Sequence, residues 1–245
     1  MKLSLEEARR ELKKAERVAV LTGAGISAES EIPVFRGPDG LWNETEIQRV
    51  ATMPGFLGDP DYAWSFHLEL MKIIHRAKPN RSHQILAEME KHIDSFHLIT
   101  QNIDNLHQDA GSSDVIELHG NIWNVKCLDE DKIFPVDQSS LDDFQTRCEH
   151  CGGVLKPNVV FFGEALPREA LEKAVKVSQE ADIMLVVGTS AVVQPAASLP
   201  FLTKQSGGLI FEFNPNPTSL TLACDISVQE SSSTGLERLW KPTKQ

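Results

Sequence analysis

The chain has 245 residues, of which 41% are hydrophobic and 24% are charged, and its net charge at pH 7 is −11. This length fits one large α/β domain, or such a domain with a small satellite. The acidic balance disfavours a nucleic-acid surface, which needs clustered lysine and arginine, and no apolar run approaches the roughly 20 residues that span a bilayer. We therefore expect a cytoplasmic globular protein without nucleic-acid or membrane partners.

A glycine-rich turn follows the first predicted strand, Arg17–Thr22, which is the short apolar run of a buried parallel strand. Gly23 and Gly25 allow a tight turn that brings backbone N–H groups close to a pyrophosphate. We expect Ser27 to cap the helix that follows, and the small Ala28 to allow this helix to pack closely on the strand. Taken alone, the motif fits an ordinary strand-to-helix turn equally well.

Further apolar runs alternate with helical patterns along the chain. The predicted strands are Phe96–Thr100, Val115–Leu118, Ile183–Val187 and Leu209–Phe213. The predicted helices are Pro60–His75, Ser82–Lys91, Pro167–Glu180 and Pro195–Lys204. Strands that alternate with helices predict an α/β fold with a parallel sheet and helices on both faces. Ligands of such sheets bind beyond the carboxyl ends of the strands.

Two stretches interrupt this alternation, and we expect both to fold into one small domain that leans on the main sheet. The predicted small domain comprises residues 35–80, a helical module, and residues 121–158, a cysteine module. The predicted main domain comprises residues 1–34, 81–120 and 159–245.

The cysteine module carries three of the four cysteines, which in a cytoplasmic protein favours a metal site over disulfides. A structural zinc site usually has two CxxC pairs. Cys148 and Cys151 form one pair, whereas Glu130 takes the place of the thiol that should follow Cys127. Because carboxylates also bind zinc, these four residues form a candidate zinc site. A neighbouring aspartate or histidine is an alternative fourth ligand, and a module that folds without metal is another alternative.

Polar residues stand directly after two of the predicted strands. Asn102 and Asp104 follow Phe96–Thr100, and His119 follows Val115–Leu118. A histidine titrates near neutrality and is therefore a candidate general base. The amide and the carboxylate can orient sugar hydroxyls or a water, although such residues often only form turns.

Together, seven motifs resemble the sirtuin family, the NAD-dependent protein lysine deacylases. They are GAGIS at 23–27, IPVFRGPDGLW at 32–42, TQNID at 100–104, HG at 119–120, FGE at 162–164, GTS at 188–190 and FNP at 213–215. Their order and spacing cover nearly the whole chain, which is most similar to the short prokaryotic-type members.

The resemblance implies a Rossmann-like domain that binds NAD against a small zinc-bearing domain, with acyl-lysine entering the cleft between them. Nicotinamide leaves, His119 acts as general base on a ribose hydroxyl, and the products are free lysine and O-acyl-ADP-ribose. Asn102 and Asp104 are the further catalytic residues that it implies. The implied NAD-binding residues are Gly23, Ala24, Gly25, Ser27, Ala28, Phe35, Arg36, Trp42, Gln101, Asn102, Ile103, Asp104, Gly188, Thr189, Ser190, Asn214, Pro215 and Asn216. The segment Val160, Phe161, Phe162, Gly163 and Glu164 would pair with the substrate peptide as an added strand.

Some positions depart from the family pattern. Val34 replaces an aspartate common in deacetylases, a change shared with desuccinylase-like members. Those members place tyrosine and arginine three residues apart on the small-domain helix, where this chain has His67 and Leu70. Without the arginine a succinyl carboxylate loses its charged partner, so we expect deacetylation or removal of longer apolar acyl groups rather than desuccinylation, with acetyl as the first choice. Glu31 stands where the family usually has glycine.

Other functions use the same motifs. Mono-ADP-ribosyl transfer shares the chemistry with a different nucleophile, and a catalytically weak NAD- or ADP-ribose-binding module is a third possibility. A hydride-transfer dehydrogenase ranks last, because no acidic residue ends a second strand about 20 residues after the glycine turn. We expect a monomer that acts on acyl-lysine proteins or peptides.

Overall fold

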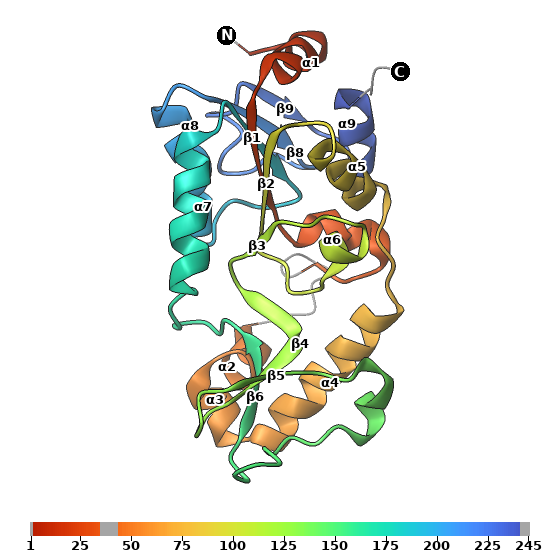
Figure 1. Ribbon diagram of the computed structural model, residues 1–245, viewed down its shortest axis with the longest axis vertical. Helices are drawn as coiled ribbons and strands as arrows, with labels where there is room; N and C mark the ends of the chain where they lie inside the picture. The colour runs from red at the N-terminus through yellow and green to blue at the C-terminus, as the bar shows by residue number, and fades with distance from the viewer. Residues whose placement is uncertain (1, 35–43, 241–245) are drawn as a thin grey trace.

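A parallel sheet forms the larger part of the computed structural model, which describes residues 2–34 and 44–240 (Figure 1). Within these residues its six strands lie in the order β3-β2-β1-β7-β8-β9, and neighbouring strands are parallel. The strands are β1 (Arg17–Thr22), β2 (Ser95–Thr100), β3 (Val115–Glu117), β7 (Ile183–Val187), β8 (Leu209–Phe213) and β9 (Ile226–Val228). All of β7 and all but the first residue of β1 are buried, as expected of central strands covered on both faces.

Helices cover both faces of this sheet. One apolar cluster joins α1, α5 and α9 to the face that carries Val20 and Leu98. A second cluster joins α7 and α8 to the opposite face, which carries Leu21 and Ile99. The helices are α1 (Leu5–Lys14), α5 (Arg81–Glu90), α7 (Arg168–Glu180), the short η3 (Ala196–Ser198), α8 (Leu199–Gln205) and α9 (Ser232–Leu239). In the described ranges, no helix is both long and apolar enough to cross a membrane.

A small antiparallel sheet lies at the other end of the molecule, beside α2, α3 and α4 (Figure 1). Its elements are α2 (Glu44–Val50), α3 (Met53–Gly58), α4 (Pro60–Arg76), β4 (Gly120–Cys127), β5 (Ile133–Pro135), η2 (Gln138–Asp143) and β6 (Leu155–Val159). Trp64 is 1% exposed and its indole N–H donates to the Leu155 carbonyl at 2.8 Å. This bond joins α4 to β6 inside the small core.

The predicted fold class is confirmed, since a parallel sheet with helices on both faces carries a second, smaller unit. The predicted strands agree with the observed bounds to within one residue. The small sheet and α9 are additions. The sequence pattern conceals the small sheet because β5 has only three residues and the polar Asn121, Asn124 and Lys126 interrupt β4.

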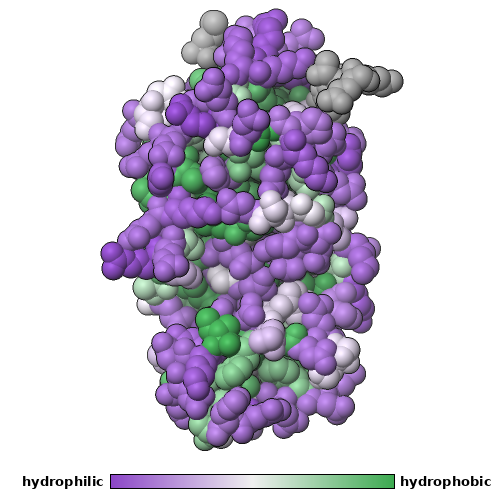
Figure 2. Space-filling view, in the orientation of Figure 1, coloured by the Kyte–Doolittle hydropathy of each residue, from purple (hydrophilic) through white to green (hydrophobic). Residues whose placement is uncertain are grey.

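The small sheet has its own apolar cluster, drawn from both stretches that interrupt the main alternation. Ile32, Leu106, Val159 and Phe161 also belong to this cluster, although they lie outside the limits predicted from the sequence. We keep the two-domain division as a proposal, with these four residues packed on the small side. Figure 2 shows a mostly hydrophilic face on which hydrophobic residues form scattered patches.

Candidate active site

The described residues predicted for catalysis and NAD binding lie after the carboxyl ends of strands of the large sheet, whose order reverses around β1. Parallel sheets bind their ligands at such a reversal. Thr22 ends β1 and Thr100 ends β2, and their hydroxyls are hydrogen-bonded to each other at 2.8 Å. The loops that follow these strands therefore start from one shared edge.

The glycine-rich turn packs directly on the loop that follows β7. The Gly25 N–H donates to the Gly188 carbonyl at 2.8 Å, and a Cβ on Gly25 would lie 2.7 Å from that oxygen. A Cβ on Gly23 would lie 2.7 Å from the Cβ of Thr189. The close contact between the two loops thus requires glycine at both positions. The Gly25 N–H is already hydrogen-bonded to the Gly188 carbonyl.

Two expectations about this turn are wrong. The segment that follows is a 3-10 helix, η1 (Ala24–Ser30), whose N-cap is Gly23, so Ser27 lies inside the helix and does not cap it. Ala28 is exposed and packs against no strand. The reason is geometric: a 3-10 helix has three residues per turn, which directs Ser27 inward and Ala28 outward.

Ser27 is the centre of a buried hydrogen-bond network. Its side chain is fully buried, and its hydroxyl donates to Asp104 Oδ2 at 2.7 Å and accepts from Asn102 Nδ2 at 3.1 Å. The other Asp104 oxygen accepts the Leu106 N–H at 3.0 Å, which begins the short helix α6 (Leu106–Asp109). Burial raises the pKa of Asp104, while these hydrogen bonds oppose the shift. The Ser27 hydroxyl therefore joins Asn102 and Asp104, two of the three predicted catalytic residues.

Two buried histidines next to this network were not predicted as site residues. The His83 Nε2 lies 3.5 Å from the Ser27 hydroxyl, and its ring is 4.8 Å from that of His107. His107 Nε2 is 3.0 Å from the Thr22 hydroxyl. Burial lowers the pKa of His83 to about 4 and holds the pKa of His107 well below its ordinary value, so both rings are neutral at pH 7. The only sequence signal for His83 is its place three residues after Asn80, which caps α5.

His119 lies between β3 and β4 with one ring nitrogen already engaged. Its Nδ1 is 2.9 Å from the Gln101 carbonyl, to which it donates in the neutral form. The lone pair then resides on Nε2, the atom that a general base requires. Burial lowers the pKa of His119 and so keeps the ring unprotonated at neutral pH, whereas the hydrogen bond to Gln101 partly opposes this shift. The Gln101 side-chain amide donates to the Thr189 hydroxyl at 3.0 Å, which links the residue that holds His119 to the loop after β7.

The predicted peptide segment starts next to His119. The Val160 N–H donates to the His119 carbonyl at 2.9 Å, and the Phe162 N–H donates to the Ala51 carbonyl at 2.8 Å. The segment is extended only as far as Phe162, and the chain then turns at Gly163, whose φ is +87°. The ring of Phe161 points inward and is 2% exposed.

The remaining predicted NAD residues line the ends of β7 and β8. Gly188 has φ of +61° and its N–H donates to the Phe213 carbonyl at 3.0 Å, which joins the GTS and FNP loops. Ser190, Pro215 and Asn216 are exposed at the surface of these loops, and the Asn214 side chain donates to the Asn216 carbonyl. Ile103 is bonded to the small sheet instead, because its carbonyl accepts the N–H of Ile122 in β4 at 3.1 Å. Phe35, Arg36 and Trp42 lie outside the described residues.

The two predicted acyl-selecting residues, His67 and Leu70, are buried on α4, with 1% and 7% of their surface exposed. His67 Nδ1 lies 2.7 Å from the Ala63 carbonyl, and the ring is 5.7 Å from that of Phe161. Burial, with a smaller effect of the Lys156 ammonium, lowers the pKa of His67 to about 4. His67 is therefore neutral at pH 7 and cannot serve as a cation for an acidic acyl group.

The candidate metal residues come together beside the small sheet. One ligand atom from each of Cys127, Glu130, Cys148 and Cys151 lies within 4.8 Å of all the others. The Cys127 and Cys151 sulfurs are 3.5 Å apart, close to the separation of about 3.8 Å that Zn–S bonds of 2.3 Å give in a tetrahedron. The Glu130 carboxylate also faces the Lys132 ammonium at 3.2 Å. The donor set fits a structural zinc ion.

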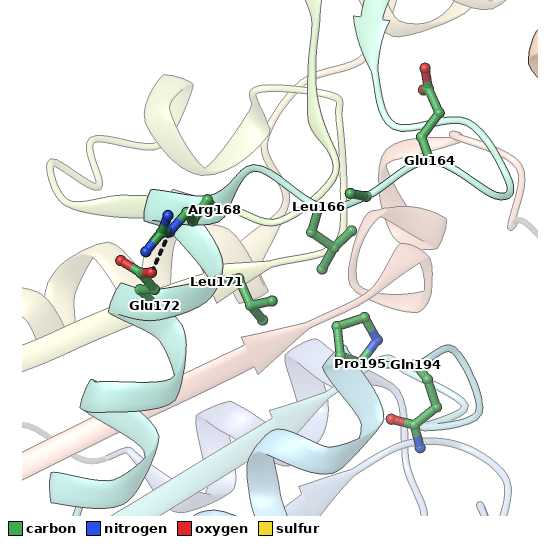
Figure 3. A pocket seen from close by; sticks show the side chains of 8 residues that line it. Glu164, Leu166, Arg168, Leu171, Glu172, Gln194 and Pro195 are labelled. Carbon is green, nitrogen blue, oxygen red and sulfur yellow. Dashed lines mark hydrogen bonds and ion pairs between the residues drawn. The ribbon is translucent and has the colours of Figure 1, made fainter.

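A shallow cavity of about 480 Å³ opens beyond Glu164, between the start of α7 and Pro195 (Figure 3). Leu166, Leu171 and Pro195 converge on it, while Arg168 and Glu172 form an ion pair at its edge, with 2.7 Å between Arg168 Nε and Glu172 Oε1. The cavity therefore has an apolar floor next to the end of the predicted peptide segment.

Comparison with known proteins places these features in one family. The Sir2 family model matches residues 23–195. An NAD-dependent protein deacylase of Aquifex aeolicus is 47% identical over 91% of this chain and 93% of its own length. The chain therefore aligns with such relatives over nearly their full length.

Solved structures give the same picture. A Sir2 homologue in complex with NAD has 41% identity and a TM-score of 0.91, and the match covers 97% of this chain and 93% of that one. A Sir2 variant with deacetylated p53 peptide and 3′-O-acetyl-ADP-ribose has 37% identity and a TM-score of 0.88, covering 98% and 97%.

Proposed function

Because the chain belongs to the Sir2 family, we propose that it is an NAD-dependent protein deacylase that consumes NAD as it removes acyl groups from lysine. The observation that carries its chemistry is the hydrogen bond from His119 Nδ1 to the Gln101 carbonyl, which leaves Nε2 as an unprotonated base. This arrangement supports catalysis rather than passive binding of the nucleotide.

Residues of this chain supply the acid–base and orienting groups. NAD supplies an electrophilic ribose carbon when nicotinamide leaves. His119 Nε2 accepts the proton of a ribose hydroxyl, and the Gln101 carbonyl stabilises the resulting imidazolium through Nδ1. Asn102 and Asp104 orient sugar hydroxyls and a water, and both are held by the buried Ser27 hydroxyl.

Zinc would have a structural role in this enzyme. Cys127, Glu130, Cys148 and Cys151 would hold it at the small sheet. There it would tie β4 to the turn that carries Cys148 and Cys151. It would supply cross-linking of this sheet and no step of the reaction.

The acyl preference follows from His67. A neutral, buried His67 beside Leu70 offers no cation to a succinyl carboxylate, and burying that carboxylate unpaired is unfavourable. The substrate acyl group is therefore neutral, with acetyl preferred. We also infer that the enzyme acts as a cytoplasmic monomer, which light scattering and cell fractionation would test.

The first experiment incubates the protein with NAD and acetyl-, succinyl- or myristoyl-lysine peptides, while nicotinamide release and peptide mass are followed. We expect acyl loss that requires NAD, fastest for the acetyl peptide. Nicotinamide release with every acyl group retained would favour ADP-ribosyl transfer or hydrolysis, and no release would favour a binding module. Faster turnover of the succinyl peptide would contradict the proposed acyl preference.

A further inference from the structure

Lys156 is a lysine of β6 whose side chain is almost completely buried, with 6% of its surface exposed. Its ammonium donates to the Val159 carbonyl at 2.7 Å and to the Pro157 carbonyl at 3.3 Å. It also lies 3.0 Å from Glu164 Oε2 and 3.9 Å from the centre of the Phe161 ring. Lysine is rarely buried unless it is paired, so this position has a specific task.

The partners of the ammonium all belong to one short stretch of chain, residues 157–164. Glu164 Oε2, which faces Lys156, also accepts the Phe161 N–H at 2.7 Å. The Glu164 N–H returns a hydrogen bond to the Phe161 carbonyl at 3.0 Å. Phe161 and Glu164 thus close a turn through Gly163, and the ammonium is bonded on both sides of this turn.

This turn lies within residues 160–164, the segment that is predicted to pair with the substrate peptide. Its Val160 and Phe162 amides are bonded to His119 and Ala51, on the protein side. Within the described ranges, the Val160 carbonyl has no hydrogen-bond partner, so the segment keeps an acceptor for an added strand. The position of this carbonyl depends on the Val159 carbonyl beside it, which Lys156 holds.

We propose that Lys156 is a positioning residue for the acyl-lysine peptide: its buried ammonium pairs with Glu164 and fixes the turn at Gly163, so that residues 160–164 present a preformed edge. The inference rests on the proposed deacylase function. It concerns the peptide rather than the nucleotide, because among the described residues the hydrogen bonds and the ion pair of the Lys156 and Glu164 side chains all stay within residues 156–164 and none reaches the Ser27 network.

Loss of the charge has a definite consequence. Glu164 is about one third exposed, with 31% of its side chain accessible, so without Lys156 its carboxylate can turn to solvent. The Phe161 N–H would then lose its acceptor, and the segment would have to be ordered each time a peptide binds. The peptide affinity therefore falls, whereas the affinity for the nucleotide does not.

The test compares Lys156→Met, Lys156→Arg and Glu164→Gln with the wild-type chain. Affinity for a fluorescent acetyl-lysine peptide is measured by anisotropy, affinity for ADP-ribose by calorimetry, and KM for each substrate by turnover. Lys173→Met is the matched control, because it removes an exposed lysine whose Nζ lies 2.5 Å from Asp114 Oδ1 on the large domain. Thermal unfolding of each variant reports its stability separately.

We expect Lys156→Met to weaken peptide binding and raise the peptide KM roughly tenfold or more, as expected when one partner of a largely buried ion pair is lost. ADP-ribose affinity should stay within about twofold. Lys156→Arg should restore most of the peptide affinity because it keeps the charge. Should Lys156→Met fail to fold, Glu164→Gln removes the ion pair from its more exposed end and should raise the peptide KM in the same direction.

Two results would overturn the inference while leaving the proposed function intact. The first is unchanged peptide affinity in both Lys156→Met and Glu164→Gln. The second is an equal loss of peptide and ADP-ribose affinity, which would assign Lys156 to general stability. A wild-type chain that binds ADP-ribose but no acyl-lysine peptide would instead overturn the proposed function, and this inference with it.

Discussion

The two sheets of this molecule are stabilised in different ways. The large sheet is parallel, and separate apolar clusters cover its two faces. The small sheet has three antiparallel strands, one apolar cluster and a group of three thiols and a carboxylate at its edge. Apolar clusters on both faces hold the large sheet, whereas the small sheet combines one apolar cluster with a donor set through which a zinc ion would cross-link it.

The two regions also treat buried titratable groups differently. Beside the large sheet, His83, His107 and Asp104 share a network in which burial disfavours every charge. On the small side, Lys156 is buried as an ammonium with acceptors around it. The reacting edge thus keeps its buried histidines neutral, while the peptide edge is fixed by a charge pair.

The largest expected effect is at the junction of the regions. His119 donates from its ring to the large side through Gln101, and its carbonyl holds the Val160 amide on the small side. His119→Ala should lower kcat/KM for deacylation about 100- to 10,000-fold, with NAD affinity retained. His92→Ala, an exposed histidine at the end of α5, is the control. Deacylation at more than a tenth of the wild-type rate would exclude His119 as the base.

Removal of zinc should destabilise the small sheet and leave the large sheet unchanged. We expect one zinc per chain by mass spectrometry, and Glu130→Ala should weaken its binding roughly 100-fold or more. Glu149→Gln, next to Cys148 but exposed and outside the cluster, should change nothing. After chelation, hydrogen exchange should accelerate in residues 120–159 and stay slow in β1, β2 and β7. Equal acceleration in both sheets would break the comparison.

The pH dependence of stability should have a contribution from a buried histidine in each region. His67 on the small side and His83 beside the large sheet both have a pKa of about 4 in the folded chain, below the ordinary 6.5. Between these values the unfolded chain binds more protons, so stability is lost as the pH falls from 6.5 towards 4. Each histidine contributes a loss of about 2 kcal/mol in unfolding free energy between pH 7 and pH 5.

Urea unfolding at these two pH values tests this expectation. His67→Gln keeps a donor for the Ala63 carbonyl and cannot titrate, so it should remove only the contribution of the small side. His83→Gln should do the same for the large side. If either variant keeps the full pH dependence, that histidine does not titrate on unfolding as expected.

The sequence predicts the elements that burial alone defines, and it fails where tertiary contact decides. Continuous apolar runs such as Ile183–Val187 mark the central strands. Asn102, Asp104 and His119 are indicated by their place after a strand and by family motifs, and the fold brings them to one edge of the sheet. His83 gave no such signal, because its neighbour Ser27 is 56 residues away. The inward turn of Ser27 depends on a 3-10 helix that composition cannot distinguish from an α-helix.

Glu31 gives the smallest predicted effect and concerns the end of that 3-10 helix. It follows η1 with φ of 64° and ψ of 19°, a left-handed conformation that glycine adopts without strain. Glu31→Gly should raise the unfolding free energy by up to about 1 kcal/mol, since relief of the strain exceeds the added entropy of the unfolded chain.

Asn105 provides the matched control for Glu31, because it is also left-handed, with φ of 69°, and asparagine tolerates this region better than glutamate. Asn105→Gly also removes the side-chain hydrogen bonds of Asn105 with Asp109 and Asn121, so it should give no gain, and urea midpoints of the two variants measure the difference. Glu31 ends the helix that carries Ser27, so a stability gain without loss of NAD affinity would mean that the strain serves no binding role. A gain accompanied by weaker NAD binding would mean that the left-handed glutamate helps to hold η1 against the nucleotide.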